Sequence, residues 1–377
     1  MEIKTISPPI SESNSGYMPQ LDTLRTIAVA LVLISHWLIE NEFLHKLNLG
    51  IFGVTLFFVL SGFLISQILL KSRAIAEMKE QSMFHSVKQF YIRRFLRIFP
   101  VYYVTLIILY RYNIESIRDI FIWYVTYTQN IFIFLTNDWH GLLSHLWTLA
   151  VEEQFYLVWP FVILFIPKRF LFTSIIAIIL IGPVSRTFLY WMYGDMGESF
   201  LFYVLTPACM DAFGLGALMA YYRINNKNAF DFKTLYSKLF IVLVFIFLVL
   251  LHDATGILYN TIGQLINYKM FQHFFYKLSI SVICFYMVSK VSIGYTGFLK
   301  KIFENKVLIY LGKISYGLYL FHPYVHVMYK KAGLPSLSEH IYIRFAVYFI
   351  ILVMISSVSW YILEKPINGL KRYFAYN

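Results

Sequence analysis

Little in this 377-residue sequence suits a soluble enzyme or a secreted, disulfide-linked protein. It has two cysteines, Cys209 and Cys284, both in apolar stretches, and only 14% of its residues are charged. It lacks paired CxxC motifs, an HExxH motif, a phosphate-binding Walker loop and a dinucleotide-binding glycine pattern, and its ten histidines show no metal-ligand spacing. We therefore expect no metal cofactor and no nucleotide-binding domain.

Apolar residues dominate instead: 59% of the chain is hydrophobic and the mean hydropathy is +0.64, a composition that soluble domains rarely have. Runs long enough to cross a bilayer occur at 22–40, 51–70, 98–112, 146–166, 170–190, 200–222, 238–252, 273–290, 306–328 and 343–363. A further apolar stretch, 117–135, is expected to be re-entrant or partial. The sequence predicts an all-α, polytopic integral membrane bundle of about ten transmembrane helices.

Basic residues indicate the orientation of this bundle. The segment 71–97 contains seven lysines and arginines, and later alternate connections are also basic. Because short loops rich in Lys and Arg stay in the cytoplasm, both termini are predicted to be cytoplasmic, in a multi-pass protein of the bacterial inner membrane. The net charge of +12 is then mostly a matter of topology. Binding to specific lipids is a weaker alternative, and no nucleic-acid module is visible.

Residues 1–16 are expected to be a disordered cytoplasmic tail, 17–370 one transmembrane domain, and 371–377 a short cytoplasmic tail. The tail at 1–16 shows no secretory signal, so the first span is expected to act as the insertion signal. Any chemistry must then come from polar groups inside the bundle.

The first polar cluster lies in the first apolar run, where Asp22, Arg25 and His36 share one helix face. Arg25 and His36 are eleven residues apart, close to three helical turns and about 16 Å of rise. Ionisable groups within a membrane helix usually face the bundle interior or a water-filled path. Snorkelling of Arg25 and a structural contact for His36 are the alternative.

The second cluster is YIRRFLRIFP, at the cytoplasmic end of the third run. Arg94 and Arg97 are three residues apart and share a helix face, with Arg93 beside them. Two guanidinium groups at this separation suit a polyphosphate, although a simple topological anchor would look the same.

The third cluster, SHLWTLAVEEQFYLVWP, places Glu152 and Glu153 in an apolar helix, with His145 seven residues before Glu152. Adjacent residues diverge by about 100° around a helix, so one carboxylate is expected to face the site and the other to form structural hydrogen bonds. A desolvated glutamate can carry a proton or orient an imidazole. An acid at the positive end of a helix dipole is the alternative.

The fourth cluster, LGKISYGLYLFHPYVHV, forms a polar stripe of Ser315, Tyr319 and His322. Pro323 is expected to kink or end the helix and to free backbone groups beside His322. Site and structural roles for His322 are equally supported.

These clusters, together with GVTLFFVLSGFLIS at 53–66 and YILEKPI at 361–367, resemble the acyltransferase-3 family of integral membrane O-acyltransferases. The resemblance covers nearly the whole chain, with the motifs in the family's order. It implies transfer of an acyl group, commonly acetyl from acetyl-CoA, to a hydroxyl of a cell-surface glycan such as a polysaccharide or lipopolysaccharide, or of its lipid-linked precursor. It also implies that Arg25 and His36 are an essential pair and that Arg94 and Arg97 bind the donor.

The chain departs from the family pattern at two positions. Thr55 stands where many relatives have an acidic residue, and Cys209 stands where an arginine is expected, two residues before Asp211. We therefore expect an arginine–carboxylate pair to be missing at Asp211, and bonding to neighbouring helices is the favoured role of this residue.

The reaction hypothesis depends on depth in the membrane. Phosphates of cytoplasmic acetyl-CoA would dock on the arginines, and the pantetheine arm would extend toward His36. His36 would deprotonate an acceptor hydroxyl or be acylated first, with Glu152 or Glu153 orienting it or accepting its proton. A lipid or small-metabolite acceptor, and a transporter with no acyl chemistry, are the alternatives. The sequence makes no prediction of the oligomeric state.

Overall fold

The computed structural model describes residues 17–38, 40–41, 47–193, 200–225, 268–334 and 341–376, together with Leu44 and Val244. Within these residues every regular element is helical and there is no strand, as predicted. The predicted tail at 1–16 lies outside the described residues, as does the predicted span at 238–252 except for Val244.

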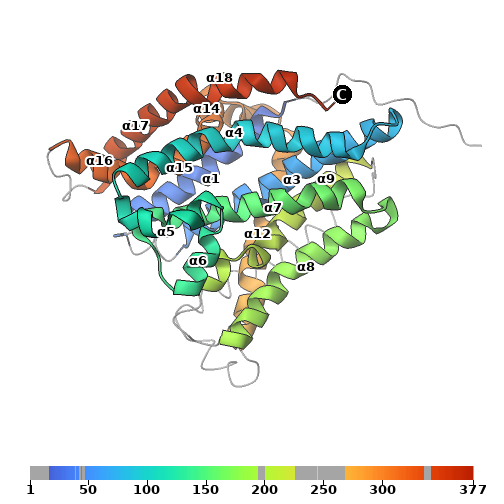
Figure 1. The fold of residues 1–377 in the computed structure, drawn as a ribbon, viewed down its shortest axis with the longest axis horizontal. Coiled ribbons are helices and arrows are strands. Elements are labelled where there is room, and N and C mark those ends of the chain that lie inside the picture. The colour runs from blue at the N-terminus through green and yellow to red at the C-terminus, as the bar shows by residue number, and fades with distance from the viewer. Residues whose placement is uncertain are drawn as a thin grey trace, which may run out of the picture.

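In the part of the chain that the structure describes, seven long helices form the frame (Figure 1). They are α1 (Pro19–Trp37), α3 (Leu49–Met78), α4 (Met83–Arg111), α7 (Trp147–Phe165), α8 (Lys168–Tyr193), α12 (Tyr268–Ile293) and α17 (Ile341–Ser359). Shorter elements connect them: η2 (Ile114–Ser116), α5 (Ile117–Val125), α6 (Gln129–Thr136), η3 (Gly141–Leu146), η4 (Phe200–Val204), η5 (Thr206–Cys209), α9 (Met210–Ile224), α13 (Gly297–Phe303), α14 (Lys306–Lys313), α15 (Ser315–Phe321), η7 (His322–Tyr324), α16 (Val325–Lys331), η8 (Trp360–Glu364), α18 (Lys365–Gly369) and η9 (Leu370–Tyr373).

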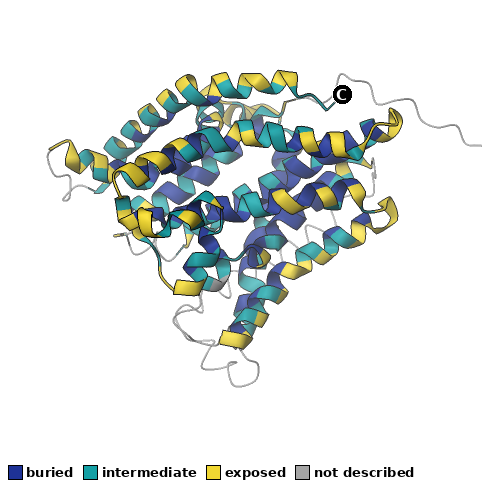
Figure 2. Cartoon of the chain, in the orientation of Figure 1, coloured by how far each residue is buried: buried dark blue, intermediate teal, exposed yellow. Residues whose placement is uncertain are grey.

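Five helical stretches in the described part of the chain are long and apolar enough to cross a membrane. They are Leu49–Met78, Gly141–Phe165, Lys168–Tyr193, Met270–Ile293 and Ile341–Tyr373. Large apolar side chains are exposed along α8, such as Val184 and Phe188, and along α17, such as Ile350 and Met354. Figure 2 shows these exposed faces on the outside and the buried residues in the interior. This distribution fits a bundle surrounded by lipid. The total of about ten spans and the cytoplasmic termini stay predictions.

Three predicted spans have different boundaries in the structure. The run 98–112 belongs to α4, which begins at Met83, so most of the basic segment 71–97 is helical rather than a loop. The run 200–222 is broken into η4, η5 and α9, with Pro207 at the start of η5. The run 306–328 is interrupted at Ile314, between α14 and α15, and again at Pro323. Proline lacks an amide hydrogen and clashes with the preceding turn, which explains the breaks at Pro207 and Pro323.

The apolar stretch 117–135 forms two short helices, α5 and α6, of nine and eight residues. Neither approaches the roughly 20 residues that a helix needs to cross a bilayer. The stretch is therefore not a single full crossing, in agreement with the sequence prediction.

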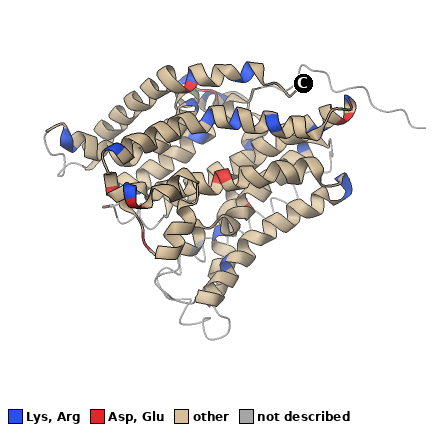
Figure 3. Cartoon of the chain, viewed as in Figure 1, with Lys and Arg blue, Asp and Glu red and all other residues tan. Residues whose placement is uncertain are grey.

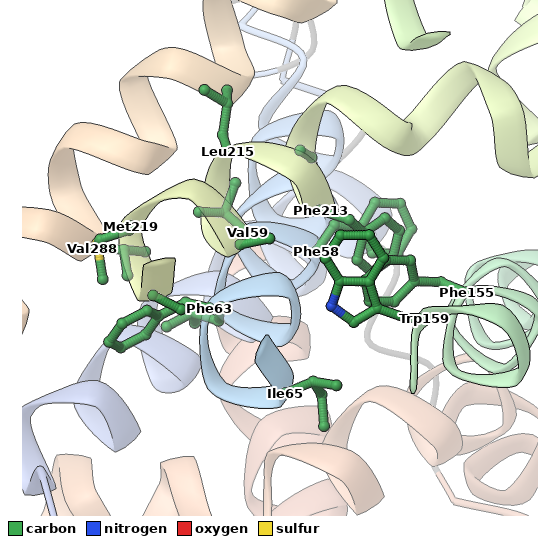
Figure 4. Close-up of a cluster of buried hydrophobic side chains, with 14 of the residues drawn as sticks. Phe58, Val59, Phe63, Ile65, Phe155, Trp159, Phe213, Leu215, Met219 and Val288 are labelled. Atoms are coloured by element: carbon green, nitrogen blue, oxygen red, sulfur yellow. The ribbon is translucent and has the colours of Figure 1, made fainter. Parts of the chain in front are cut away.

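Helices α3 and α9 approach each other closely at two glycines, Gly62 of α3 and Gly216 of α9. A Cβ atom on Gly62 would lie 2.2 Å from the Phe213 carbonyl oxygen, and one on Gly216 would lie 2.2 Å from the Val59 carbonyl oxygen. Beside this contact, Phe213 stacks with Phe58 and Phe155 (Figure 4). Small residues allow such close approach of membrane helices. This contact fixes α3, which contributes residues to the site described next.

Candidate active site

Two cavities lie along α1 and α3. The first, here called the arginine cavity, has a volume of about 320 Å³. Its charged lining residues are Arg25, Arg93, Arg94, Arg97, Lys371 and Glu152. Because five cations face one carboxylate, the cavity is strongly positive. Figure 3 shows that, outside α4 and the helix ends, the bundle has few charged residues. A cavity of this kind suits a ligand with several negative charges.

Two arginines of this cavity, Arg94 and Arg97 of α4, are free to bind a ligand. Neither Arg94 nor Arg97 forms an ion pair with a described carboxylate. Arg94 stacks on the Tyr156 ring, 3.8 Å from its centroid, and its Nε has no hydrogen-bond partner among the described residues. Stacking holds the guanidinium plane in place while leaving its hydrogen-bond donors available.

The other two arginines that line this cavity, Arg25 of α1 and Arg93 of α4, are held by neighbouring groups. Arg25 forms an ion pair with Asp22, which also accepts a hydrogen bond from Tyr17. Arg93 donates to the carbonyl oxygens of Lys371 and Phe374, at 2.8 and 2.9 Å. Asp22 itself does not line either cavity. We infer that it positions Arg25 rather than contacting a ligand.

The contacts of Arg93 draw the last residues of the chain against the cavity. Lys371 and Tyr376 belong to the segment that the sequence analysis assigned to a cytoplasmic tail, yet both line the arginine cavity. Sequence reasoning did not include them in the site. The basic pair at 371–372 was the available signal.

The second cavity, here called the histidine cavity, has a volume of about 550 Å³. His36 lines it from the C-terminal end of α1, and His145 lines it from η3. Arg25, three turns earlier on α1, lines the other cavity. The predicted separation of the two residues along one helix is therefore confirmed in its geometry.

His36 is hydrogen-bonded to a second histidine. The His322 Nε2 and His36 Nδ1 atoms are 3.0 Å apart, and the His322 Nδ1 lies 2.6 Å from the Tyr319 carbonyl oxygen. A carbonyl oxygen can only accept, so His322 carries a proton on Nδ1. In a neutral His322, Nε2 then accepts from the Nδ1–H of His36. The remaining nitrogen of a neutral His36, Nε2, keeps its lone pair and can act as a base.

Pro323 explains why the Tyr319 carbonyl is available. In a continuous helix this oxygen would accept from the amide four residues later, which is position 323, and proline has no amide hydrogen. The Nδ1–H of His322 takes its place. The expectation that Pro323 frees backbone groups beside His322 is thus confirmed.

His145 packs against the same break. Its ring lies 5.1 Å from that of His322, centroid to centroid, and its Nε2 lies 3.2 Å from the Leu320 carbonyl oxygen. The Tyr319 hydroxyl donates to the His145 carbonyl oxygen at 3.0 Å and contacts the Thr148 hydroxyl at 2.7 Å. The third and fourth sequence clusters are therefore joined in space, which the sequence analysis did not predict.

The two cavities meet at Tyr319 and Val54, which line both. Ser315, one turn before Tyr319, lines only the arginine cavity. A cluster of cations thus lies on one side of Tyr319 and an imidazole base on the other. Such an arrangement can hold the anionic end of an extended donor apart from a reacting group.

A family comparison decides what kind of protein carries this arrangement. Residues 18–364 match the family model described as an acyltransferase domain. The chain belongs to the acyltransferase-3 family. The match includes all four motif clusters of the sequence analysis, so the resemblance drawn from them is confirmed.

Curated relatives of this acyltransferase-3 chain are O-acetyltransferases. It is 30% identical over 393 residues to peptidoglycan O-acetyltransferase OatA of Listeria monocytogenes, and 24% identical over 373 residues to O-acetyltransferase OatA of Staphylococcus aureus. These alignments cover 95% and 93% of the chain but 57% of each relative. The chain therefore spans little more than half the length of the relatives it matches. No solved structure matches it.

The paired glutamates of the acyltransferase-3 domain point in different directions. Glu152 lines the arginine cavity and accepts a hydrogen bond from Ser61 at 2.9 Å. Glu153 lines neither cavity, and its Oε1 has no hydrogen-bond partner among the described residues. No hydrogen bond joins His36 to either carboxylate in the described part of the chain. The group that orients His36 is His322.

Asp211 corrects one prediction and confirms another. The expected loss of an arginine partner is wrong, because Arg186 of α8 binds Asp211 through two contacts of 3.0 and 3.2 Å. Both side chains are fully buried, and Ser281 of α12 also donates to Asp211. Asp211 thus joins neighbouring helices, as favoured, and lines neither cavity.

Proposed function

We propose that the chain transfers an acetyl group from cytoplasmic acetyl-CoA to a hydroxyl of a cell-surface glycan or its lipid-linked precursor. The observation that carries this proposal is the meeting of the cation-lined cavity and the His36 cavity at Tyr319 and Val54. The name of the Listeria relative, a peptidoglycan O-acetyltransferase, supports a glycan as the acceptor.

In the arginine cavity, the phosphates of the donor would bind Arg94, Arg97 and Lys371. The pantetheine arm would then extend past Tyr319 toward His36. The rise of about 16 Å between Arg25 and His36 is of the length that an extended arm requires. Glu152 would contact the arm through the polar wall it shares with Ser61.

In the histidine cavity, Nε2 of His36 would remove the proton of the acceptor hydroxyl while the hydroxyl oxygen attacks the thioester carbonyl carbon. The C–S bond then breaks, and the leaving CoA thiolate accepts this proton from the His36 imidazolium to give free CoA. The hydrogen bond to His322 keeps Nδ1 of His36 protonated throughout. General base catalysis of this kind contributes roughly 10²–10⁴-fold to a rate.

The experiment is acetyl transfer from radiolabelled acetyl-CoA to a lipid-linked disaccharide by the protein in lipid nanodiscs, with the product measured as base-labile ester. His36→Ala is expected to lower kcat by at least about 100-fold. His326→Ala is the matched control, because this exposed histidine lines neither cavity. Transfer at the wild-type rate by His36→Ala would rule out the proposed role.

A further inference from the structure

The histidine cavity contains a buried cation that forms no ion pair with a carboxylate in the described part of the chain. Lys277 of α12 lines this cavity and is only 3% exposed. No aspartate or glutamate is among the lining residues. No described carboxylate forms an ion pair with Lys277.

The groups around the Lys277 ammonium are neutral. Nζ donates to the Cys209 sulfur at 3.1 Å and to the Tyr203 carbonyl oxygen at 3.4 Å. It also lies 5.3 Å from the Tyr203 ring centroid and 6.0 Å from that of Trp147. An ammonium has three donors, and these contacts use two of them. Aromatic rings offset part of the free-energy cost of removing a cation from water, but they do not neutralise its charge.

Asp211, two residues after Cys209 in the sequence, does not neutralise Lys277. Asp211 is already bound by two nitrogens of Arg186 and by the hydroxyl of Ser281. The charges of Asp211 and Arg186 neutralise each other, and neither residue lines the cavity. The described residues that line the cavity include two histidines, His36 and His145, and several tyrosines. Lys277 is the only lysine, arginine, aspartate or glutamate among them.

We propose that the histidine cavity recognises an acceptor bearing an oxyanion, either a phosphate or a carboxylate, with Lys277 as the cation that binds it. The inference rests on the proposed function for the presence of an acceptor in this cavity. Trp139 and Trp147 provide aromatic surface there, on which sugar rings pack, and Asn48 and Ser144 provide polar groups. The acceptor is then an acidic glycan or a sugar next to a phosphate, as in a lipid-linked precursor.

Binding of three soluble sugars separates these possibilities: methyl glucoside, methyl glucuronide and glucose 1-phosphate. Each is radiolabelled and measured by equilibrium dialysis against the full chain in nanodiscs. The wild-type protein is expected to bind one of the anionic sugars at least about 10-fold more tightly than the neutral sugar, the size of effect that a charge-assisted hydrogen bond gives. Preference for the glucuronide indicates a carboxylate, and preference for the 1-phosphate indicates a phosphate.

Lys277→Met is expected to abolish this preference, and Lys277→Arg to retain it. Lys290→Met is the matched control, since Lys290 lies on the same helix, rests 5.3 Å from the Tyr286 ring centroid and lines neither cavity. Equal binding of charged and neutral sugars by the wild type, or a preference that survives in Lys277→Met, would overturn the proposal.

The same preparations assayed for acetyl transfer distinguish this proposal from the proposed function. A charge preference in binding without any acetyl transfer would contradict the proposed function and leave the anion site standing. Acetyl transfer to neutral and anionic sugars alike, with equal binding, would contradict the anion site alone.

Discussion

His322 decides which nitrogen of His36 can act as a base. Without it, a neutral His36 could carry its proton on either nitrogen, and only one of the two tautomers has the lone pair on Nε2. The hydrogen bond of 3.0 Å selects that tautomer and fixes the plane of the ring. His322 lines neither cavity, so we regard it as a positioning residue.

Replacing His322 should therefore affect turnover and not substrate binding. His322→Ala is expected to lower kcat by about 100-fold, with the KM values for donor and acceptor within about twofold of wild type. His322→Gln should recover part of this loss, because a side-chain carbonyl oxygen can accept from His36 Nδ1–H.

Steady-state kinetics tests this expectation, with His326→Ala as the control. Nitrogen-15 NMR of labelled histidine adds a direct readout, since it reports the unprotonated Nε2 of His36. A His322→Ala enzyme that turns over as fast as His326→Ala would contradict the assignment.

Single residues were predictable where an ionisable group interrupts an apolar run. Arg25 and His36 stand out for this reason, and Arg94 and Arg97 stand out because they share a helix face at the start of an apolar run; all four line a cavity. Arg186 and Lys277 obey the same rule within 170–190 and 273–290, so the sequence did contain their signal.

The partners of these residues were not predictable. The hydrogen bond between His36 and His322 joins positions 286 apart in the sequence. The pairing of Asp211 with Arg186 likewise depends on how α8 packs against α9. Nothing local in either segment specifies these contacts, so a single sequence offers only the candidates.

At the scale of helices, the contact between α3 and α9 depends on the absence of side-chain atoms at two glycines. The lining of the arginine cavity includes Ser61 and Leu64, on either side of Gly62 and Phe63. Any change that separates α3 from α9 must then also alter the cavity wall.

Gly62→Ala should therefore destabilise the protein. Its Cβ would approach a backbone oxygen to 2.2 Å, so the helices must move apart. Overpacking of this kind costs about 1–3 kcal/mol in the free energy of unfolding. Thermal unfolding in nanodiscs measures the change. Gly369→Ala is the control, because no atom lies within 4 Å of the added Cβ, and equal stability of the two variants would contradict the packing argument.

Most long helices were predictable, because an apolar run of about 20 residues is a strong signal. The breaks inside 200–222 and 306–328 were harder to place. Apolar composition is the same on both sides of each break, and proline marks a possible break without stating how the chain continues. Yet the break at Pro323 creates the carbonyl acceptor on which His322 depends.

At the scale of the whole molecule, two cavities imply that donor and acceptor defects can be separated. Arg94→Ala combined with Arg97→Ala should raise the KM for acetyl-CoA by about 10-fold or more, because each removes a charge-assisted contact to phosphate. The KM for the acceptor should stay within about twofold of wild type, since neither arginine lines the histidine cavity.

Initial-rate kinetics with each substrate varied in turn provides the measurement. Arg111→Ala is the control: this exposed arginine lies at the other end of α4 and lines neither cavity. An unchanged donor KM in the double variant would remove the arginine cavity from the donor site.

The wall formed by Val54 and Tyr319 has a consequence for the cell as well as for the reaction. An enzyme that takes one substrate from each side of a bilayer must prevent ions from leaking through it and dissipating the ion gradients. The apolar and aromatic side chains of Val54 and Tyr319, where the two cavities meet, oppose the passage of hydrated ions, whereas a narrow, flexible pantetheine arm would still pass between them. In the proposed reaction, the same two side chains would therefore limit ion leakage and let the donor pass.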